Sequence, residues 1–513
     1  MSKIVDFRLS FDEDLEGYLK KKYSQYLDYR VLSKALDARG ANRGKDPSYN
    51  YKIELAFKND PFVNYEEDIS KIKAAVDKPI IIGAGPAGLF CALRLSEFGI
   101  SSIVIERGER ATQRMKKIAR FWRYGEFDEE NNVCFGEGGA GLFSDGKLIT
   151  RIKSPYVKYV MQRFVDFGAP PETAYTSNPH LGSNKIRALI TKMTDHLKEQ
   201  GCSFHYNSRV EELLMEGSRC VGVKTHDGKT YKSSNIVLAT GHSSKEMYKH
   251  INECSVAMKA KDFAVGVRIE HPRREIDSIQ YGEFASKELG AARYKLTYHN
   301  KESNKGTYSF CMCPGGYVLS SGTDYDGIVV NGMSNYSRSS PWSNSALVVS
   351  IKAGVDFSTD DVLNGHFYQK SIENKAYEYS KSAASGKEIP SQNLKDFLEN
   401  KTTKTLNKTS CPSGIFASNL REILPATVVK GLIEGLGSFD QKLDGFISEK
   451  SLLLAPETRT SAPVTILRDK NSLESQSHEA LFPCGEGAGY AGGITSAAVD
   501  GVRVAMEIIR RNS

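Results

Sequence analysis

The sequence predicts an α/β protein with a parallel sheet, because short apolar strands alternate with helical segments near both ends of the chain. Residues 79–85, PIIIGAG, form an apolar strand, residues 86–98 have a helical pattern, and residues 102–106 form a second strand. Close to the C-terminus, ALFPCGEGAGYAGG is a strand and glycine-rich loop that lead into a final helix. We therefore predict a Rossmann-like nucleotide-binding domain, interrupted by a mixed α+β substrate domain.

The N-terminal residues are predicted to form a separate small α+β domain. IVDFRLSF is a strand, Leu15–Tyr26 is helical, and YNYKIELAF at 49–57 is an alternating strand. A charged stretch at 64–78 leads into the strand at 79–85, so we place a boundary near Asp77. The predicted division is 1–76 for the small domain, 77–250 for the first part of the nucleotide-binding domain, 251–470 for the substrate domain, and 471–513 for the C-terminal part of the nucleotide-binding domain.

Further elements follow from periodicity. Residues 184–200 have one apolar face, with Ser183 as a candidate cap and Gly201 as a terminator. Short strands around 202–206, 209–216, 219–225 and 230–232 are expected to form a meander, which ends in the apolar strand 235–241. The final helix should direct four apolar residues inward: Val499, Val502, Ala505 and Ile509.

The composition excludes several classes of protein. Apolar residues make up 40% and charged residues 26%, and no tract approaches the ~20 apolar residues that span a bilayer. The first residues lack an apolar signal core, so the expected location is the cytoplasm, with no membrane span.

The net charge of +7 is small for 513 residues and does not predict nucleic-acid binding. The nine scattered cysteines predict neither a disulfide framework nor a metal site, and most should be reduced and buried.

The pattern G-x-G-x-x-G occurs three times, and its context separates the three. Only Gly83/Gly85/Gly88 follows an apolar strand, opens a helix and precedes a second strand that ends in an acid, Glu106. Gly83 allows the tight turn, Gly85 lets the backbone approach a pyrophosphate, and Gly88 allows close packing of strand and helix. Pro86 suits the first helical turn. The Glu106 carboxylate can accept hydrogen bonds from an adenosine ribose.

The other two matches have weaker contexts. The run at 134–148, CFGEGGAGLFSDGKL, either touches a flat ring or pyrophosphate with its bare backbone or is a structural loop. The match at 487–492 lies too near the C-terminus to begin a second nucleotide domain. In dinucleotide flavoproteins, however, a late strand followed by Gly-Glu or Gly-Asp places a carboxylate near the flavin, and Gly485-Glu486 fits that position. The next helix would direct its N-terminus at the flavin N1/O2 edge, although Glu486 could also be a plain surface acid.

The chain resembles a bacterial family catalogued as FAD-dependent dehydrogenases, of the glutathione-reductase-like flavoprotein class. The resemblance runs from about Pro79 to the C-terminus through nine colinear segments, among them IERG, VLATGHSS, YSFCMCPGGYV and ETRTSAPVTILRD. It implies an FAD/NAD(P)-binding Rossmann-like domain with FAD as cofactor, and a second domain over the isoalloxazine. The predicted FAD contacts are Gly83, Gly85, Pro86, Ala87, Gly88, Glu106, Arg107, Gly138, Gly139, Ser144, Val210, Gly241, Gly485, Glu486, Gly493 and Ile494.

Three residues are candidates for catalysis. Lys147 could neutralise a carboxylate or phosphate near the flavin, and His271 could be a general acid, although His-Pro at a strand end is often only a turn. Cys313 and Cys311 share one face of an alternating strand, so both could face the flavin or both the core. Redox-active thiols and plain packing or substrate contact remain alternatives for this pair.

The predicted function is that of an FAD-dependent oxidoreductase, a dehydrogenase or reductase of an unidentified small metabolite. Hydride transfer would pass through flavin N5. Because no second complete nucleotide-binding unit is visible, either NAD(P)H docks transiently as electron donor or the substrate itself reduces FAD. The alternatives are a flavoprotein that modifies RNA, with the N-terminal domain as RNA-binding module, and a non-catalytic FAD-binding redox sensor. The N-terminal residues show no basic stripe with interleaved aromatics, which disfavours the RNA hypothesis. The sequence does not indicate an oligomeric state.

Overall fold

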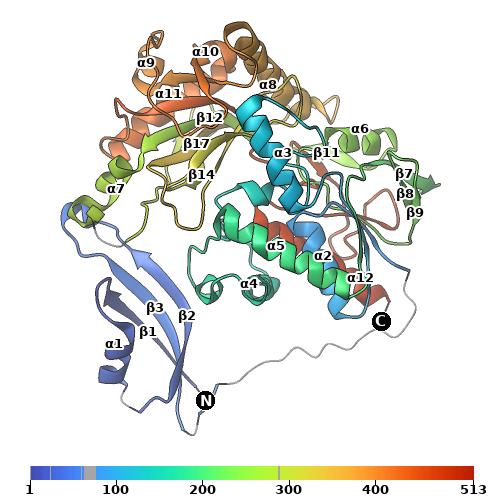
Figure 1. The fold of residues 1–513 in the computed structure, drawn as a ribbon, viewed down its shortest axis with the longest axis horizontal. Helices are drawn as coiled ribbons and strands as arrows, with labels where there is room; N and C mark the ends of the chain where they lie inside the picture. Colours follow the sequence, from blue (N-terminus) through green and yellow to red (C-terminus); the bar gives the residue numbers. More distant parts are fainter. Residues whose placement is uncertain (1, 24, 59, 63–76, 287–288, 513) are drawn as a thin grey trace.

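The computed structural model describes residues 2–23, 25–58, 60–62, 77–286 and 289–512. Helices α2, α5 and α12 lie in the lower half of Figure 1, and strands β12, β14 and β17 form part of a larger sheet above them. The N-terminal strands stand to one side, at the lower left. The mixed α/β fold class with a Rossmann-like domain is confirmed.

A five-stranded parallel sheet forms the centre of the nucleotide-binding half. Its strands run in the order β22-β10-β4-β5-β6, and every neighbouring pair is parallel. All five strands are short, and four of them are mostly buried, as expected for a sheet covered on both faces, whereas the edge strand β6 is half-buried. The last strand of the chain therefore completes the sheet that the first strand–helix–strand unit begins. The strands are β4 (Ile80–Ile82), β5 (Ile103–Ile105), β6 (Ser203–His205), β10 (Ile236–Leu238) and β22 (Leu481–Pro483).

Helices cover one face of this sheet, and the two that flank the glycine loops pack against each other. Gly501 in α12 has no room for a Cβ atom, which would overlap the carbonyl oxygen of Ala87 in α2. The four residues predicted to face inward on α12 are all buried. Gly99 follows α2 with a φ of 83°, the left-handed conformation of a helix C′ glycine. The helices are α2 (Pro86–Glu97), α3 (Ala111–Tyr124), α4 (Tyr156–Asp166), α5 (Gly182–Glu199) and α12 (Ile494–Arg511), with short turns η2 (Ala140–Phe143) and η3 (Pro171–Ala174).

Two sequence expectations in this region are wrong. Ser183 does not cap α5, because the helix begins at Gly182 and the Ser183 hydroxyl instead donates to the side-chain oxygen of Asn335 at 3.2 Å. The strand near 202–206 does not join the meander. It follows helix α5 and therefore returns parallel to β5, with Ser203 paired to Ile103.

The meander covers the opposite face of the parallel sheet. It contains β7 (Val210–Glu216), β8 (Arg219–Thr225) and β9 (Thr230–Lys232), which pair antiparallel in sequence order. Val210, Leu213 and Val223 pack in one apolar cluster with Ile80 and Ile236 of the parallel sheet. Beside them lie α6 (Lys245–Glu253) and the antiparallel pair β11 (Met258–Ala260) and β21 (Val464–Ile466).

A second, mostly antiparallel sheet of seven strands dominates residues 263–457. Its order is β13-β14-β17-β12-β20-β18-β19, and its apolar core joins the sheet to helix α11. The strands are β12 (Phe263–Pro272), β13 (Thr297–Asn300), β14 (Lys305–Cys313), β17 (Trp342–Ile351), β18 (Ile389–Asn393), β19 (Ile415–Ala417) and β20 (Leu452–Glu457). A two-stranded ribbon and helices complete this half: β15 (Tyr317–Ser320), β16 (Val330–Met333), α7 (Arg273–Tyr281), η4 (Gly282–Ser286), α8 (Asn364–Ala383), α9 (Leu394–Glu399), α10 (Leu420–Ile423) and α11 (Ala426–Lys442).

The N-terminal unit is a three-stranded antiparallel sheet with one helix. It contains β1 (Lys3–Ser10), α1 (Leu15–Lys22), β2 (Asp28–Asp37), η1 (Ala41–Arg43) and β3 (Ser48–Ala56), with β3 in the middle. Strand β2 is not recognisable in the sequence, because the strand is half-exposed and a bulge between Val31 and Ser33 disturbs its alternation. Lys34 joins β2 to the main body, since its N–H donates to the carbonyl of Tyr175. Most of the charged stretch at 64–78 lies outside the described residues.

The cysteines are all described and all free, and six of the nine are buried. Within the described ranges no helix is long and apolar enough to cross a membrane. The same ranges contain no group of three or more His, Cys, Asp or Glu residues placed to hold a metal ion.

Candidate functional site

One cavity of about 380 Å³ opens at the carboxyl ends of β4, β5 and β10. Crevices at this edge of an open parallel sheet are where α/β proteins bind their ligands, and the volume is typical of a ligand pocket. Its wall combines segments that are far apart in the sequence. They are the loop after β4, the loop after β5, the run 134–147, the loop 239–244, the end of β14 and the C-terminal loop 484–494.

The first glycine loop has a geometry in which each glycine is required for a different reason. Gly83 has a φ of 107°, and a Cβ atom there would overlap the carbonyl oxygen of Ala239. A Cβ atom at Gly88 would overlap the carbonyl oxygen of Gly83, so strand and helix approach as closely as backbone allows. Gly85 is the N-cap of α2 and brings no side chain to the helix N-terminus. The bare backbone therefore faces the cavity with the positive end of the helix dipole, which suits a pyrophosphate.

Glu106 is held at the cavity wall by three backbone donors. Its Oε2 accepts from the N–H of Ala84 at 2.8 Å, and its Oε1 accepts from Gly108 at 3.1 Å and Gly136 at 2.9 Å. These bonds leave Oε2 one acceptor position, since each carboxylate oxygen can accept about two hydrogen bonds. The side chain is fixed and can still accept one bond from a ribose hydroxyl. The neighbouring Arg107 stacks on the ring of Phe135, with its guanidinium 3.8 Å from the ring centroid.

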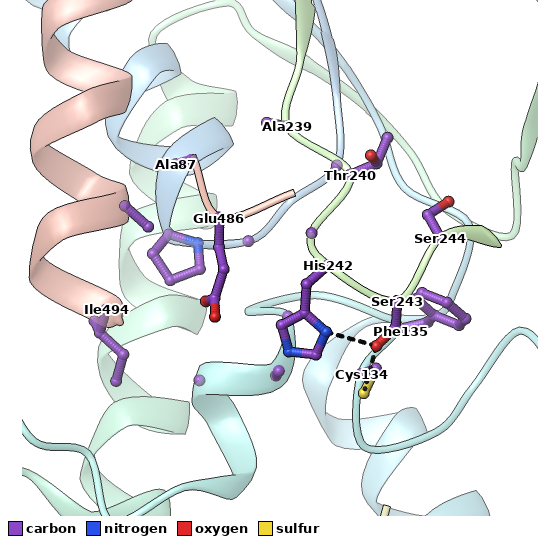
Figure 2. A pocket seen from close by; sticks show the side chains of 18 of the residues that line it. Ala87, Cys134, Phe135, Ala239, Thr240, His242, Ser243, Ser244, Glu486 and Ile494 are labelled. Atoms are coloured by element: carbon purple, nitrogen blue, oxygen red, sulfur yellow. Dashed lines mark hydrogen bonds between the residues drawn. The ribbon is translucent and has the colours of Figure 1, made fainter. Parts of the chain in front are cut away.

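The C-terminal loop contributes a carboxylic acid and a second helix N-terminus. Figure 2 shows Glu486 reaching into the pocket that His242 also lines. Burial raises the pKa of Glu486 to about 7, and the nearby Lys261 opposes this effect. Gly493 caps α12 without a side-chain hydrogen bond, and open space surrounds the Cβ positions of Gly492 and Gly493. This end of the cavity can therefore receive a flat, electron-rich group against free backbone N–H groups.

Most of the predicted FAD contacts line the cavity, but three lie behind it. Gly88 packs against Gly83, as described above. Gly138 braces the run 134–147 by donating its N–H to the carbonyl of Ala84 at 2.8 Å. Gly485 donates to Asp500 at 2.8 Å and has only 2.8 Å between its Cβ position and that of Ala87. The residues at the wall are Gly83, Gly85, Pro86, Ala87, Glu106, Arg107, Gly139, Ser144, Val210, Gly241, Glu486, Gly493 and Ile494.

The structure separates the three catalytic candidates. Lys147 lines the cavity, and its ammonium group donates to the carbonyl of Met312. His271 does not reach the cavity. Its ring is fully buried against Phe446, donates a 2.9 Å hydrogen bond from Nε2 to that residue's carbonyl, and has a pKa lowered to about 4 by burial. A general-acid role for His271 is therefore not supported, because the apolar packing of the strand end encloses it.

The cysteine pair differs from the regular strand that the sequence suggested. The register of β14 shifts between Phe310 and Cys313, and Cys311 has a φ of 46°. The expected simple alternation is wrong at this point because of the bulge. Cys311 lines the cavity, whereas Cys313 is fully buried behind it.

Sequence reasoning missed several polar residues of the wall. Arg459 forms ion pairs with Glu373 at 2.7 Å and Asp324 at 3.4 Å. His242 is 2.8 Å from the hydroxyl of Ser243, and burial lowers its pKa to about 4. The segments VLATGHSS and ETRTSAPVTILRD contain these residues, but the sequence did not show which side chains face a cavity. Asn331, Glu457 and Thr460 also line the cavity.

The donor set fits a dinucleotide flavin. One glycine loop and helix N-terminus offer N–H groups for a pyrophosphate, Glu106 offers an acceptor for a ribose, and the α12 N-terminus offers N–H groups for a ring edge. The bare Cβ positions of Gly241, Gly492 and Gly493 leave room for close approach. These groups are the ones that FAD requires at its two ends.

Comparisons with known proteins agree with this fit. Residues 77–253 match the family described as "Pyridine nucleotide-disulphide oxidoreductase", and residues 262–460 match "FAD-dependent protein, C-terminal domain-like". An uncharacterised protein of Clostridium beijerinckii is 37% identical over 99% of this chain and 98% of its own length. The probable indole-3-pyruvate monooxygenase YUCCA1 of Arabidopsis thaliana is 24% identical over 34% of each chain.

The matches among solved structures are distant. The L-amino acid deaminase of Proteus myxofaciens, solved with anthranilate, is 12% identical with a TM-score of 0.37, covering 88% of this chain and 94% of that one.

The two family matches and the full-length relative decide the assignment. The chain belongs to the FAD-dependent oxidoreductases in which a pyridine nucleotide-disulphide oxidoreductase domain precedes the FAD-dependent C-terminal domain, and its cofactor is FAD.

Proposed function

We propose that the chain is an FAD-dependent dehydrogenase or reductase that acts on a small metabolite by hydride transfer through flavin N5. One observation carries the proposal: a single cavity is lined both by the two glycine loops and by polar groups from the seven-stranded half. Phe310 and Cys311 at the end of β14, together with Arg459 after β20, form this second wall. A substrate and a bound flavin would therefore share one space.

The residues of the chain have separate tasks in this proposal. The α2 N-terminus at Gly85 holds the pyrophosphate, and Glu106 fixes the adenosine ribose through its free acceptor position. The α12 N-terminus at Gly493 stabilises negative charge on the ring edge, and Glu486 accepts or donates a proton nearby, because its pKa of about 7 allows both forms at neutral pH. FAD supplies the atom that accepts or gives up hydride.

The number of nucleotide-binding units in the fold limits the possible sources of the hydride. In the part of the chain that the structure describes, only the β4–α2–β5 unit has a glycine loop at the start of its helix and a carboxylate at the end of its second strand. A pyridine nucleotide would then dock transiently over the flavin, or a reduced metabolite would itself deliver the hydride and be oxidised. Both routes use the wall at Cys311 and Arg459.

Anaerobic photometry tests the proposal. The purified protein is titrated in turn with NADH, NADPH and fractionated metabolite pools while the oxidised flavin band is recorded. Reduction by one of these, followed by reoxidation with a second compound, is the expected result. A protein that retains FAD but is reduced by none of them would instead be a non-catalytic FAD-binding protein, and the proposal would be abandoned.

A further inference from the structure

The end of β14 has an unusual backbone where it meets the flavin cavity. Cys311 adopts a φ of 46°, in the left-handed region that residues with a Cβ atom rarely occupy. Such a conformation costs about 1–3 kcal/mol and persists only where surrounding contacts enforce it. The bulge directs Phe310 and Cys311 to the cavity wall and leaves Cys313 in the interior. A cysteine that merely fills space would not require this conformation.

Two cations hold the bulge in place. The Nη1 atom of Arg268 donates to the carbonyl of Cys311 at 3.3 Å and lies 3.9 Å from the sulfur of Cys313. From the other side, the Lys147 ammonium donates to the carbonyl of Met312. The carbonyls of Cys311 and Met312 therefore each meet a positive charge, and the Cys313 thiol also donates to the Cys311 carbonyl at 3.3 Å. Positive charge at this position favours a thiolate over a thiol.

The two cysteine side chains interact, and the pKa values of their thiols shift in opposite directions. A hydrogen bond from Cys313, together with the charges of Lys147 and Arg268, lowers the pKa of Cys311 below its ordinary value. The same hydrogen bond and burial raise the pKa of Cys313. The Cys311 sulfur, which lines the cavity, therefore ionises readily, whereas the Cys313 sulfur behind it stays protonated. This is the asymmetry that thiol–disulfide exchange uses, with an accessible attacking sulfur and a buried resolving one.

We propose that Cys311 and Cys313 form a redox-active thiol pair that exchanges two electrons with FAD and acts on small-molecule disulfides. The pair lies within residues 262–460, outside the segment that matches the disulphide oxidoreductase family. The inference rests on the proposed function, which supplies reduced FAD from a hydride donor such as a reduced pyridine nucleotide.

The reaction balances in three steps. The Cys311 sulfur attacks one sulfur of the substrate disulfide, the substrate S–S bond breaks, and one thiolate leaves and takes a proton. Cys313 then loses its proton and attacks the Cys311 sulfur, which releases the second thiol and closes the Cys311–Cys313 disulfide. That disulfide reopens with two electrons taken from reduced FAD and two protons from solvent.

Reductive titration of the holoprotein tests the pair without measuring turnover. Air-oxidised protein is titrated anaerobically with dithionite, and the free thiols are counted by alkylation and mass spectrometry before and after. We expect about four electrons per FAD in the wild type and about two in Cys311→Ser and Cys313→Ser, since the pair is a second two-electron centre. The Cys254→Ser variant is the matched control, because that half-buried cysteine lies outside the cavity wall and should leave the count at about four.

The outcomes separate this inference from the proposed function. In one outcome, a hydride donor reduces the bound FAD, but both thiols are already alkylated before reduction and the wild type takes up as many electrons as the variants. The thiol pair is then refuted, and the proposed function stands. If hydride donors and metabolites leave FAD oxidised while dithionite still reveals the extra two-electron centre, the proposed function fails and the pair stands. FAD content and circular dichroism of each variant confirm that the serine substitutions leave the protein folded.

Discussion

Arg268 binds both carboxylate oxygens of Glu457, at 2.8 and 3.0 Å, across the neighbouring strands β12 and β20. Both side chains are buried, and Glu457 lines the cavity. The same guanidinium donates to Asn344 at 2.8 Å and to the Cys311 carbonyl. This ion pair therefore connects the core of the seven-stranded sheet to the bulge at the cavity wall.

Replacing Arg268 by methionine should destabilise the protein strongly. The substitution leaves the Glu457 carboxylate buried without its partner, which costs about 3–5 kcal/mol of the free energy of unfolding. Urea denaturation measures the loss. Arg39→Met is the matched control, because Arg39 also binds an aspartate, Asp37, with two hydrogen bonds but is almost fully exposed. There the loss should stay below about 1 kcal/mol, and equal losses in the two variants would contradict this interpretation.

The reactivity of Cys311 should depend on pH as that of an acidified thiol. Its pKa lies below the ordinary value of 9.0, so the alkylation rate should reach its plateau at a lower pH than for a free cysteine, and should fall on acidification. Cys313→Ala removes the hydrogen bond and should move the profile to higher pH, whereas Cys313→Ser keeps a donor and should restore much of it. Peptide mass spectrometry after iodoacetamide treatment gives the rate. A profile unchanged in Cys313→Ala would show that the neighbouring thiol has no influence.

Glu486 should make the FAD-free protein less stable as the pH rises. Its folded-state pKa of about 7 exceeds the ordinary value of 4.5, so the folded state binds the proton more tightly than the unfolded state. This contribution to stability is complete below about pH 4.5 and is lost as the pH rises to about 7. Glu486→Gln should therefore gain about 1–3 kcal/mol over the wild type at pH 8 and nothing at pH 4.5. Chemical denaturation of both proteins at the two pH values measures the difference, and an equal difference at both would rule out this ionisation.

Two helical glycines should respond oppositely to alanine. At Gly88 in α2 the new methyl group would overlap the Gly83 carbonyl, and the strain should cost about 1–3 kcal/mol. At Gly437 in α11 no atom of the described part of the chain lies within 4 Å of the Cβ position, so alanine should stabilise by about 0.5–1 kcal/mol. Thermal unfolding of the two variants gives the comparison. A stabilising Gly88→Ala would mean that the strand and helix are not in contact there.

The sequence predicted those parts of the site whose signals are local. The loop at Gly83 is recognisable because an apolar strand, a glycine turn and a helix follow one another directly, and the late Gly485-Glu486 pair follows its own strand. The three-stranded N-terminal sheet was only partly predicted, since the half-exposed strand β2 has no clean alternation.

The rest depends on partners that are distant in the sequence. Arg459 reaches the cavity wall because Glu373 and Asp324, on other segments, neutralise it in the interior. The bulge at Cys311 depends on Arg268 and Lys147 and leaves no trace in an alternating pattern. His271 looked like a possible catalyst because it is a polar residue at a strand end, yet it is enclosed in the core, where its Nε2 donates to the Phe446 carbonyl. Composition and spacing contain none of these relationships.

The FAD content of Gly85→Val tests most directly whether this cavity holds the cofactor. Among the residues that the structure describes, only the Cα atom of Gly139, at 3.9 Å, approaches the Cβ position of Gly85, whose φ of −80° suits any residue. Valine should therefore leave the fold intact while its side chain occupies the place of the pyrophosphate. We predict a folded, colourless protein with at least a tenfold loss of FAD affinity, beside a yellow Gly437→Ala control. A folded Gly85→Val protein that retains one FAD per chain would contradict the account.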